Sequence, residues 1–211
     1  MTGFDDAMAE VGYRCAATHQ TYARWNGYAQ EAVRYKPTDA HPSYMKMGAI
    51  AERIADYDAI LWLDADTAVM NKEVRVEALA SPSHVMTISL DWCSEVGAER
   101  VASTHNGVSC GNFIVRNTPD TARFMATWAE ERERFCNRPM WEQDALRYQI
   151  GRNRWMNAQV CRLPRRSLNA VHRECVNRNF PDAAPYPYQH GDFLLHLTNV
   201  DRVRILDEIG L

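Results

Sequence analysis

The 211-residue sequence contains no apolar run of the roughly 18 residues that a membrane-spanning helix needs. Its first residues, MTGFDDAMAEVG, are acidic and lack the charged start and apolar middle of a signal peptide. The six cysteines include no Cys-x-x-Cys pair, so most of them are expected to be buried or free thiols. These absences predict a soluble, cytoplasmic protein without a membrane span.

A block of lysine and arginine is also absent, and the formal net charge is -3. Tight nonspecific binding to nucleic acid requires a basic surface, so nucleic acid is not an expected partner. Hydrophobic residues make up 46% of the chain, which indicates a globular protein with a real core. The length suits one domain covering residues 1–211.

Apolar runs and turn residues alternate along the chain in a way that predicts strands and helices in turn. Strands are expected at 28–35, 59–63, 85–90, 113–115 and 193–197. Helices are expected at 13–25, 43–56, 118–135, 142–150 and 200–209. In the second helix Met47, Ile50, Ala51 and Ile54 share one face, which should be buried. The alternation predicts an α/β class with a mainly parallel sheet flanked by helices.

The apolar run Ala59–Leu63 ends abruptly in Asp64-Ala65-Asp66. Ligands of open α/β sheets bind beyond the carboxyl ends of the strands, and residues i and i+2 of an extended chain point the same way. Two adjacent carboxylates repel, and a divalent cation removes that conflict. Mg²⁺ and Mn²⁺ bind through one or two carboxylates and substrate phosphate oxygens. The pattern favours a metal-bridged diphosphate, although Asp64 could instead cap a turn and Asp66 be solvated.

His196 interrupts the apolar run Phe193–Leu197, where a buried imidazole needs a polar partner. A backbone carbonyl is the common partner of such a histidine. An imidazole is also a suitable third ligand for a cation that two carboxylates already hold. Both interpretations of His196 remain open from the residues alone.

The order of these motifs resembles that of retaining glycosyltransferases of the GT-A (Rossmann-like) fold, most closely the family 34 galactosyl- and xylosyltransferases. The segments that carry the resemblance are HQTYARWNGY (19–28), ILWLDADTAVMN (60–71), SCGNFIVRN (109–117), WEQDAL (141–146) and GDFLLHL (191–197). The resemblance spans nearly the whole chain. It implies an enzyme that transfers a hexose or pentose from a nucleotide sugar, mainly a UDP-sugar, to a glycan or other hydroxyl acceptor.

The resemblance also implies a set of site residues. Asp64, Asp66 and His196 would hold Mn²⁺ (or Mg²⁺). The donor would contact Thr2, Phe4, Lys46, Asp64, Ala65, Asp91 and Asn112. Gln143 and Asp144 would line the sugar pocket together with a Gly111–Asn112 turn, and Asp144 would lie under the anomeric carbon or bond to sugar hydroxyls.

Simpler interpretations of four of these residues stay open. Asp144 could cap the helix 142–150, and Asn112 could be a turn residue. Lys46 could be a solvated helix lysine, and Asp91 could begin the polar loop 91–109. That loop is long enough to suggest a functional one.

The sequence departs from the family pattern at three places. The chain begins almost on the first strand, Ser109 stands where the family usually has asparagine, and no lysine closely follows His196. Two other functions share parts of the pattern: a metal-dependent sugar nucleotidyltransferase and a non-catalytic carbohydrate-binding protein. A nucleotidyltransferase would be expected to have a glycine-rich phosphate-binding loop near the N-terminus, and the segment TGFDDAM is not glycine-rich.

Overall fold

The central sheet of the molecule is mixed. In this computed structural model, which describes residues 1–36, 41–91, 107–138, 140–175 and 187–211, four strands pair in the order β3-β6-β5-β7. They are β3 (Ala59–Leu63), β6 (Val108–Arg116), β5 (Met86–Leu90) and β7 (Val160–Leu163). β6 runs antiparallel to both of its neighbours, while β5 and β7 are parallel.

Two short strands extend this sheet on the β3 side. β1 (Thr2–Phe4) pairs in parallel with β2 (Ala32–Arg34). The Met1 amine donates to the Leu61 carbonyl at 2.9 Å, and the Leu63 amide donates to the Met1 carbonyl at 3.0 Å. When the amine and the carbonyl of one residue bond to two residues, i and i+2, of the neighbouring strand, the two strands are parallel. Apart from β6, the strands therefore share one direction, which confirms the expected α/β class with a mainly parallel sheet.

A separate two-stranded ribbon brings together segments that are far apart in the sequence. β4 (Thr67–Val69) pairs antiparallel with β8 (Leu194–His196), and Thr67 lies opposite His196. Because β4 follows Asp66 directly, this register places His196 beside the aspartates that end β3.

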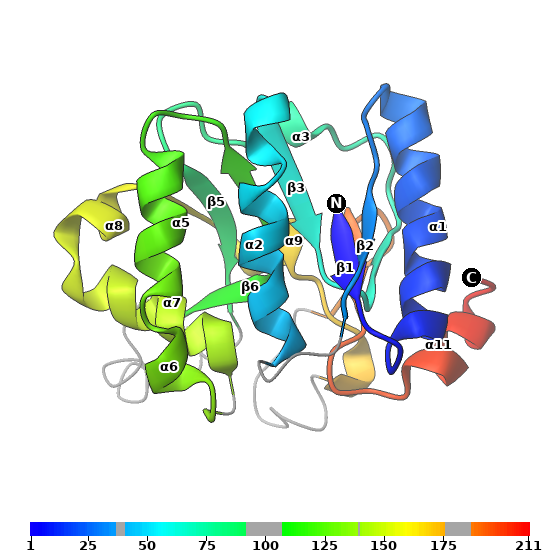
Figure 1. Ribbon diagram of the computed structural model, residues 1–211. Helices are drawn as coiled ribbons and strands as arrows, with labels where there is room; N and C mark the ends of the chain where they lie inside the picture. Colours follow the sequence, from blue (N-terminus) through cyan, green and yellow to red (C-terminus); the bar gives the residue numbers. More distant parts are fainter. Residues whose placement is uncertain (37–40, 92–106, 139, 176–186) are drawn as a thin grey trace.

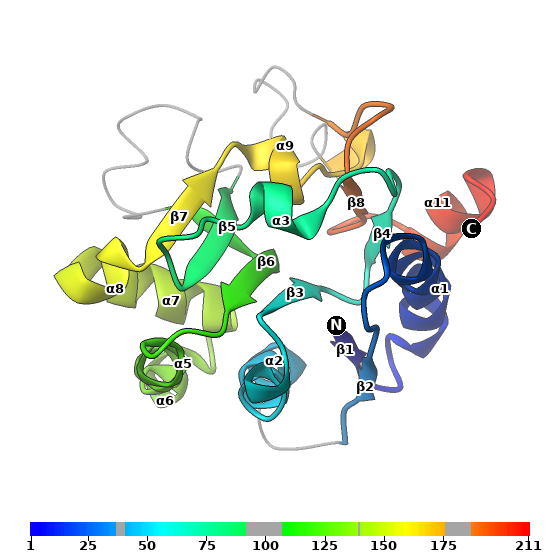
Figure 2. The same ribbon diagram turned by 90° about the horizontal axis from the view of Figure 1, so that it is seen from above.

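Helices cover both faces of the sheet, as Figures 1 and 2 show. The longer ones are α1 (Ala9–Asn26), α2 (Met45–Ala51), α5 (Thr121–Ala129), α7 (Trp141–Arg152) and α11 (Arg202–Glu208). The short ones are α3 (Val76–Leu79), α6 (Arg132–Phe135), α8 (Arg154–Ala158), α9 (Arg165–Leu168) and the 3₁₀ turns η1 (Pro42–Tyr44) and η2 (Ile54–Asp56). In Figure 2, α2, α5 and α6 lie on one side of the sheet and α9 on the other.

Two of the apolar cores follow from this arrangement. The larger packs the sheet against α2, α5 and α7 and includes Trp62, Phe113 and Trp128. Another joins α1, β8 and α11 through residues such as Cys15, Leu195 and Leu206. The second core fixes the C-terminal helix beside the β4–β8 ribbon, close to His196.

Most expected elements are present, although the expected helix 118–135 is divided into α5 and α6 and two other expectations are wrong. Ala51 is exposed, so the predicted buried face of the second helix holds only for Met47, Ile50 and Ile54. Gly111 and Asn112 lie within β6 rather than in a turn, and this strand is longer than the expected 113–115. Most of the polar loop 91–109 lies outside the described residues.

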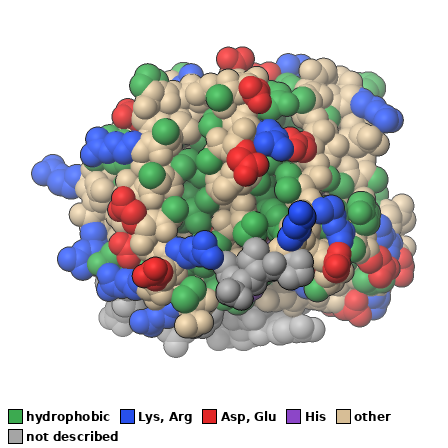
Figure 3. Space-filling model, in the orientation of Figure 1, with side chains coloured by type: hydrophobic (Ala, Val, Ile, Leu, Met, Phe, Trp, Pro, Cys, Tyr) green, Lys and Arg blue, Asp and Glu red, His purple; other side chains and the backbone are tan. Residues whose placement is uncertain are grey.

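Two surface properties bear on partners. Among the described residues, none of the helices has the length and apolar character to cross a bilayer. Figure 3 shows positive and negative side chains interspersed over the face presented there, in line with a net charge of -3 for the whole sequence.

Candidate metal and donor site

Three potential metal ligands meet where β3 ends and the β4–β8 ribbon begins. Asp64, Asp66 and His196 each offer one ligand atom, and these atoms all lie within 4.8 Å of one another. A turn closed by the Thr67 amide on the Asp64 carbonyl, at 3.0 Å, holds the two aspartates together. Two carboxylates and an imidazole are donors that suit Mg²⁺ or Mn²⁺, so the residues present fit a divalent cation.

Asp66 is the most strongly paired carboxylate of this cluster. His196 Nε2 lies 3.3 Å from its Oδ1, and Arg202 Nε donates to its Oδ2 at 2.8 Å. Burial alone would raise the pKa of Asp66, but His196 and Arg202 together hold the pKa well below its usual value. The pKa of His196 is raised, because Asp66 and Asp64 outweigh the effect of burial. Asp66 therefore stays ionised and concentrates positive charge around itself.

Asp64 is held by one of its two oxygens. The Trp62 indole and the Lys46 ammonium both donate to Oδ1, each at 2.9 Å. Desolvation raises the pKa of Asp64, Lys46 opposes this, and Asp66 adds to it. The Asp64 side chain keeps 31% of its surface exposed, so its other oxygen is the one left to face the cluster and solvent.

Lys46 is buried at the back of the site and uses all three of its donors. They reach Asp64 Oδ1 at 2.9 Å, the Cys110 carbonyl at 2.8 Å and Glu142 Oε1 at 2.8 Å. Burial lowers the pKa of Lys46, but Asp64 and Glu142 raise it by more, so the ammonium stays charged. The interpretation of Lys46 as a solvated helix lysine is wrong: it links α2 to β3, β6 and α7.

Gly111 makes room for the histidine. A Cβ atom built on Gly111 would lie 2.6 Å from His196 Cε1, closer than real side chains approach. Glycine is thus required inside β6 by this close approach, not by a turn. The neighbouring Asn112 is fully buried, and its Oδ1 lies 3.3 Å from the Asp64 amide.

Gln143 lies inside a second polar group, at the start of α7. Its Oε1 accepts from the Cys110 amide at 2.8 Å, and its Nε2 donates to Asp91 Oδ2 at 3.3 Å. Arg147 pairs with the same Asp91 oxygen and lies 3.8 Å from Asp144 Oδ1. The Asp144 side chain keeps 30% of its surface exposed.

The remaining expected donor residues lie on β1 and after β3. Thr2 and Phe4 are buried in β1, and Ala65 is buried between the two aspartates. The Thr2 hydroxyl has no hydrogen-bond partner among the described residues. The backbone bonds from Met1 to β3 bring β1 alongside the strand that carries the aspartates.

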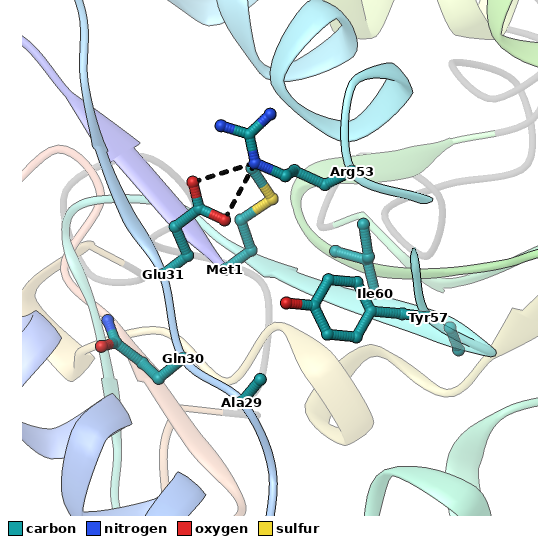
Figure 4. A pocket seen from close by; sticks show the side chains of 8 residues that line it. Met1, Ala29, Gln30, Glu31, Arg53, Tyr57 and Ile60 are labelled. Carbon is teal, nitrogen blue, oxygen red and sulfur yellow. Dashed lines mark hydrogen bonds and ion pairs between the residues drawn. The ribbon is translucent and has the colours of Figure 1, made fainter. Parts of the chain in front are cut away.

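A pocket also opens at the opposite end of β3 (Figure 4). Its lining is Met1, Ala29, Gln30, Glu31, Arg53, Tyr57, Ala59 and Ile60. Arg53 Nε donates to both oxygens of Glu31, at 3.2 Å each. The lining of the pocket includes none of Asp64, Asp66 and His196, so it is not part of the candidate site.

Four residues near the cluster were not identified from the sequence. They are Trp62, Glu142, Asn169 and Arg202. Arg202 lies 136 positions from Asp66 and Glu142 lies 96 from Lys46, so their pairing depends on the fold. The six-residue step from His196 to Arg202 was the one available signal, since it places a cation just beyond the final strand.

Known proteins are similar to this chain in sequence and in fold. The model of the galactosyl transferase GMA12/MNN10 family matches residues 100–203, which include Gly111, Gln143 and His196. The chain resembles family 34 glycosyltransferases. It is 24% identical over 208 residues to the probable alpha-1,2-galactosyltransferase gmh1 of Schizosaccharomyces pombe, covering 86% of this chain and 61% of that protein. It is 30% identical over 96 residues to the probable alpha-1,2-galactosyltransferase gmh2 of the same yeast, covering 46% of this chain and 25% of that protein.

Solved structures establish the GT-A fold. A glycosyltransferase involved in glycosylating the major capsid of PBCV-1 superposes with a TM-score of 0.68 at 14% identity, covering 99% of this chain and 96% of that one. The galactosyltransferase LgtC, solved with donor and acceptor sugar analogs, gives 0.58 at 13% identity, covering 99% and 94%. The chain covers 96% of the first of these structures, although it spans only 61% of gmh1.

Proposed function

We propose that this chain is a metal-dependent glycosyltransferase that moves a sugar from a nucleotide-sugar donor to a hydroxyl of a glycan or other acceptor, with retention of anomeric configuration. The observation that carries the proposal is the Asp64–Asp66–His196 cluster at the carboxyl end of β3. In open α/β sheets this end of the strands is where ligands bind. Relatives described as probable galactosyltransferases make UDP-galactose the first donor to test, followed by UDP-glucose and UDP-xylose.

The charged residues of the cluster have defined roles in this proposal. Asp64, Asp66 and His196 would hold Mn²⁺ or Mg²⁺. When bound, such a cation supplies positive charge that stabilises a departing diphosphate. Arg202 adds a second positive charge next to Asp66, and its side chain keeps 32% of its surface exposed to meet a phosphate. Arg202 thereby compensates for the lysine that does not follow His196.

The sugar would lie between the cluster and the start of α7. Asn112 Nδ2 is buried and has no hydrogen-bond partner among the residues that the structure describes, so it is a donor available to a sugar hydroxyl. Gln143 and Asp91 hold each other and border the same space. Asp144 is the candidate nucleophile or electrostatic stabiliser, because its carboxylate is partly exposed and near Arg147.

Two routes would retain the configuration. In one, the Asp144 carboxylate attacks the anomeric carbon as the nucleoside diphosphate leaves. The acceptor oxygen then displaces Asp144 and its proton passes to the diphosphate or to water, by analogy with retaining glycosidases. In the other, the departing phosphate accepts the proton of the acceptor hydroxyl on the same face. Asp144→Asn separates them, because loss of the nucleophile abolishes the first route and only weakens electrostatic support for the second.

The test is Mn²⁺-dependent turnover of nucleotide sugars by the purified chain. We expect released nucleoside diphosphate, and we expect Asp66→Ala to lower the rate by at least a hundredfold while the circular dichroism spectrum stays that of the wild type. Free pyrophosphate as product would instead identify a sugar nucleotidyltransferase. Binding without turnover would indicate a carbohydrate-binding protein, and an Asp66→Ala variant with full Mn²⁺-dependent activity would remove Asp66 from the site.

A further inference from the structure

The imidazole of His196 is restrained at three of its ring atoms. Its Nε2 faces Asp66 Oδ1 at 3.3 Å, and its Nδ1 lies 2.8 Å from Asn169 Oδ1. Its Cε1 lies over Gly111, where no side chain fits. The ring can therefore neither turn nor exchange partners without breaking the bond to Asn169.

The contact with Asn169 determines which ring nitrogen carries the proton. An amide oxygen only accepts hydrogen bonds, so a bond from Nδ1 to Asn169 Oδ1 requires a proton on Nδ1. In the neutral imidazole the other nitrogen, Nε2, then carries a lone pair. Nε2 faces Asp66 Oδ1 at 3.3 Å. Below the pKa of His196 a proton fills this contact, and above that pKa the lone pair would be available to a cation held by the same group of atoms.

Asn169 is itself held in place. It follows α9 and is 2% exposed, and its amide donates to the Arg165 carbonyl at 3.0 Å. The buried Ser89 on β5 fixes α9, because its hydroxyl donates to the Pro164 carbonyl at 3.1 Å and accepts from the Leu168 amide at 2.9 Å. A chain of bonds therefore runs from the central sheet to the imidazole.

The backbone of His196 is tied to the same segment. The His196 amide donates to the Ala170 carbonyl at 2.8 Å, and the His172 amide donates to the His196 carbonyl at 3.3 Å. Both the main chain and the ring of His196 thus depend on residues 169–172. Attachment at both the main chain and the ring is expected of a segment that orients a metal-binding histidine. A histidine exposed to solvent needs no such attachment.

We infer that Asn169 is a positioning residue that keeps His196 in the Nδ1-protonated tautomer, so that Nε2 is presented as a metal ligand. Outer partners of metal-binding histidines fix the tautomer and ring orientation, and their loss typically lowers metal affinity by about 10- to 100-fold. This inference rests on the proposed metal site, but the protonation of His196 can be measured without any metal.

The first experiment is ¹⁵N–¹H correlation spectroscopy of the metal-free protein above the pKa of His196, with His196→Gln used to assign its signals. We expect a protonated Nδ1 and a bare Nε2 in the wild type. In Asn169→Leu, which has a similar volume and no acceptor, we expect a mixture of tautomers. In Asn169→Asp, which keeps the acceptor, the wild-type tautomer should return. A wild-type His196 protonated on Nε2 would overturn the inference.

The second experiment measures Mn²⁺ affinity by electron paramagnetic resonance. Asn169→Leu should bind Mn²⁺ about 10- to 100-fold more weakly, and Asn169→Asp within about threefold of the wild type. Asn153→Ala is the control, since Asn153 caps α8 by accepting from the Met156 amide at 3.2 Å, and we expect its loss to affect stability and not Mn²⁺ affinity. Unchanged affinity in Asn169→Leu would contradict the inference, whereas a wild type that binds no Mn²⁺ but shows the expected tautomer would contradict the metal site alone.

Discussion

The His196 ring occupies the space in which a side chain at position 111 would lie. Gly111 is therefore the most informative single residue of the site. A methyl group at 111 would lie 2.6 Å from His196 Cε1, so the ring must shift from its position in the site. We expect Gly111→Ala to weaken Mn²⁺ binding at least tenfold and to cost about 1–3 kcal/mol of stability through overpacking. Calorimetric titration with Mn²⁺ and urea unfolding measure the two effects.

Gly48 is the matched control for this substitution. It lies within α2, and a Cβ atom there would meet nothing within 4 Å. Gly48→Ala should leave Mn²⁺ binding unchanged and stabilise the protein by roughly 0.5–1 kcal/mol, as expected for glycine to alanine in a helix. Should Gly111→Ala bind Mn²⁺ as the wild type does, the placement of His196 over Gly111 is wrong.

Site residues that interrupt a hydrophobic pattern could be identified from the sequence, and those that interrupt no pattern could not. Asp64, Asp66 and His196 stand out because each is polar within or directly after an apolar strand. Trp62 and Asn169 interrupt nothing: Trp62 belongs to an apolar strand, and Asn169 lies in a segment without periodicity. Their roles come from contacts at the site, such as the 2.9 Å bond from Trp62 to Asp64, which no local signal encodes.

Among the secondary-structure elements, α1 is fastened to β4 by a buried histidine. His19 Nε2 lies 2.7 Å from the Thr67 carbonyl, so the ring donates there, and its Nδ1 has no partner among the described residues. Burial lowers the pKa of His19 to about 4 from an ordinary value near 6.5. The folded protein therefore keeps this ring neutral under conditions in which the unfolded chain protonates it.

This difference predicts a pH dependence of stability. Since the folded pKa is the lower one, the unfolded chain binds an extra proton between about pH 6.5 and pH 4, and stability falls as the pH falls through that window. A shift of this size corresponds to about 3 kcal/mol. Urea midpoints at pH 7, 5.5 and 4.5 should fall more steeply for the wild type than for His19→Gln.

His19→Gln is chosen because a glutamine amide can still donate to the Thr67 carbonyl but does not titrate. Carboxylates elsewhere titrate in both proteins and cancel in the comparison. Parallel curves for the two proteins would show that His19 takes up its proton in the folded state, and that α1 does not exclude it from water as the structure indicates.

Elements defined by a clear period were predictable, and those that depend on pairing were not. β3 was expected at 59–63 and lies there, because its apolar run ends on charged residues. α1 ends at Asn26, before Gly27 with φ 74°, as the Asn-Gly pair indicated. β6 was underestimated because Gly111 and Asn112 are typical turn residues. Their place in the strand is fixed by pairing with β3, where Asn112 lies opposite Leu63.

For the molecule as a whole, the candidate site is where distant parts of the chain hold one another. Asp66 precedes β4, His196 ends β8 and Arg202 begins α11, while Lys46 on α2 joins Glu142 on α7 through one ammonium. Separating any of these elements would separate the ligand atoms. A ligand of the assembled site should therefore stabilise the entire fold against unfolding, not only a local loop.

Because the site exists only in the assembled fold, ligand binding should raise the stability of the whole protein. At 100 times its dissociation constant, a ligand that binds only the folded state adds about 2.7 kcal/mol of stability. For a domain of this size, each kcal/mol raises Tm by about 2–4 °C, so we expect an increase of about 5–10 °C. The increase should require Mn²⁺ and a nucleoside diphosphate or nucleotide sugar together, and should be largest for the true donor. Asp66→Ala, scanned by calorimetry under the same conditions, should show little of it; an equal increase in that variant would mean that the nucleotide binds away from the cluster.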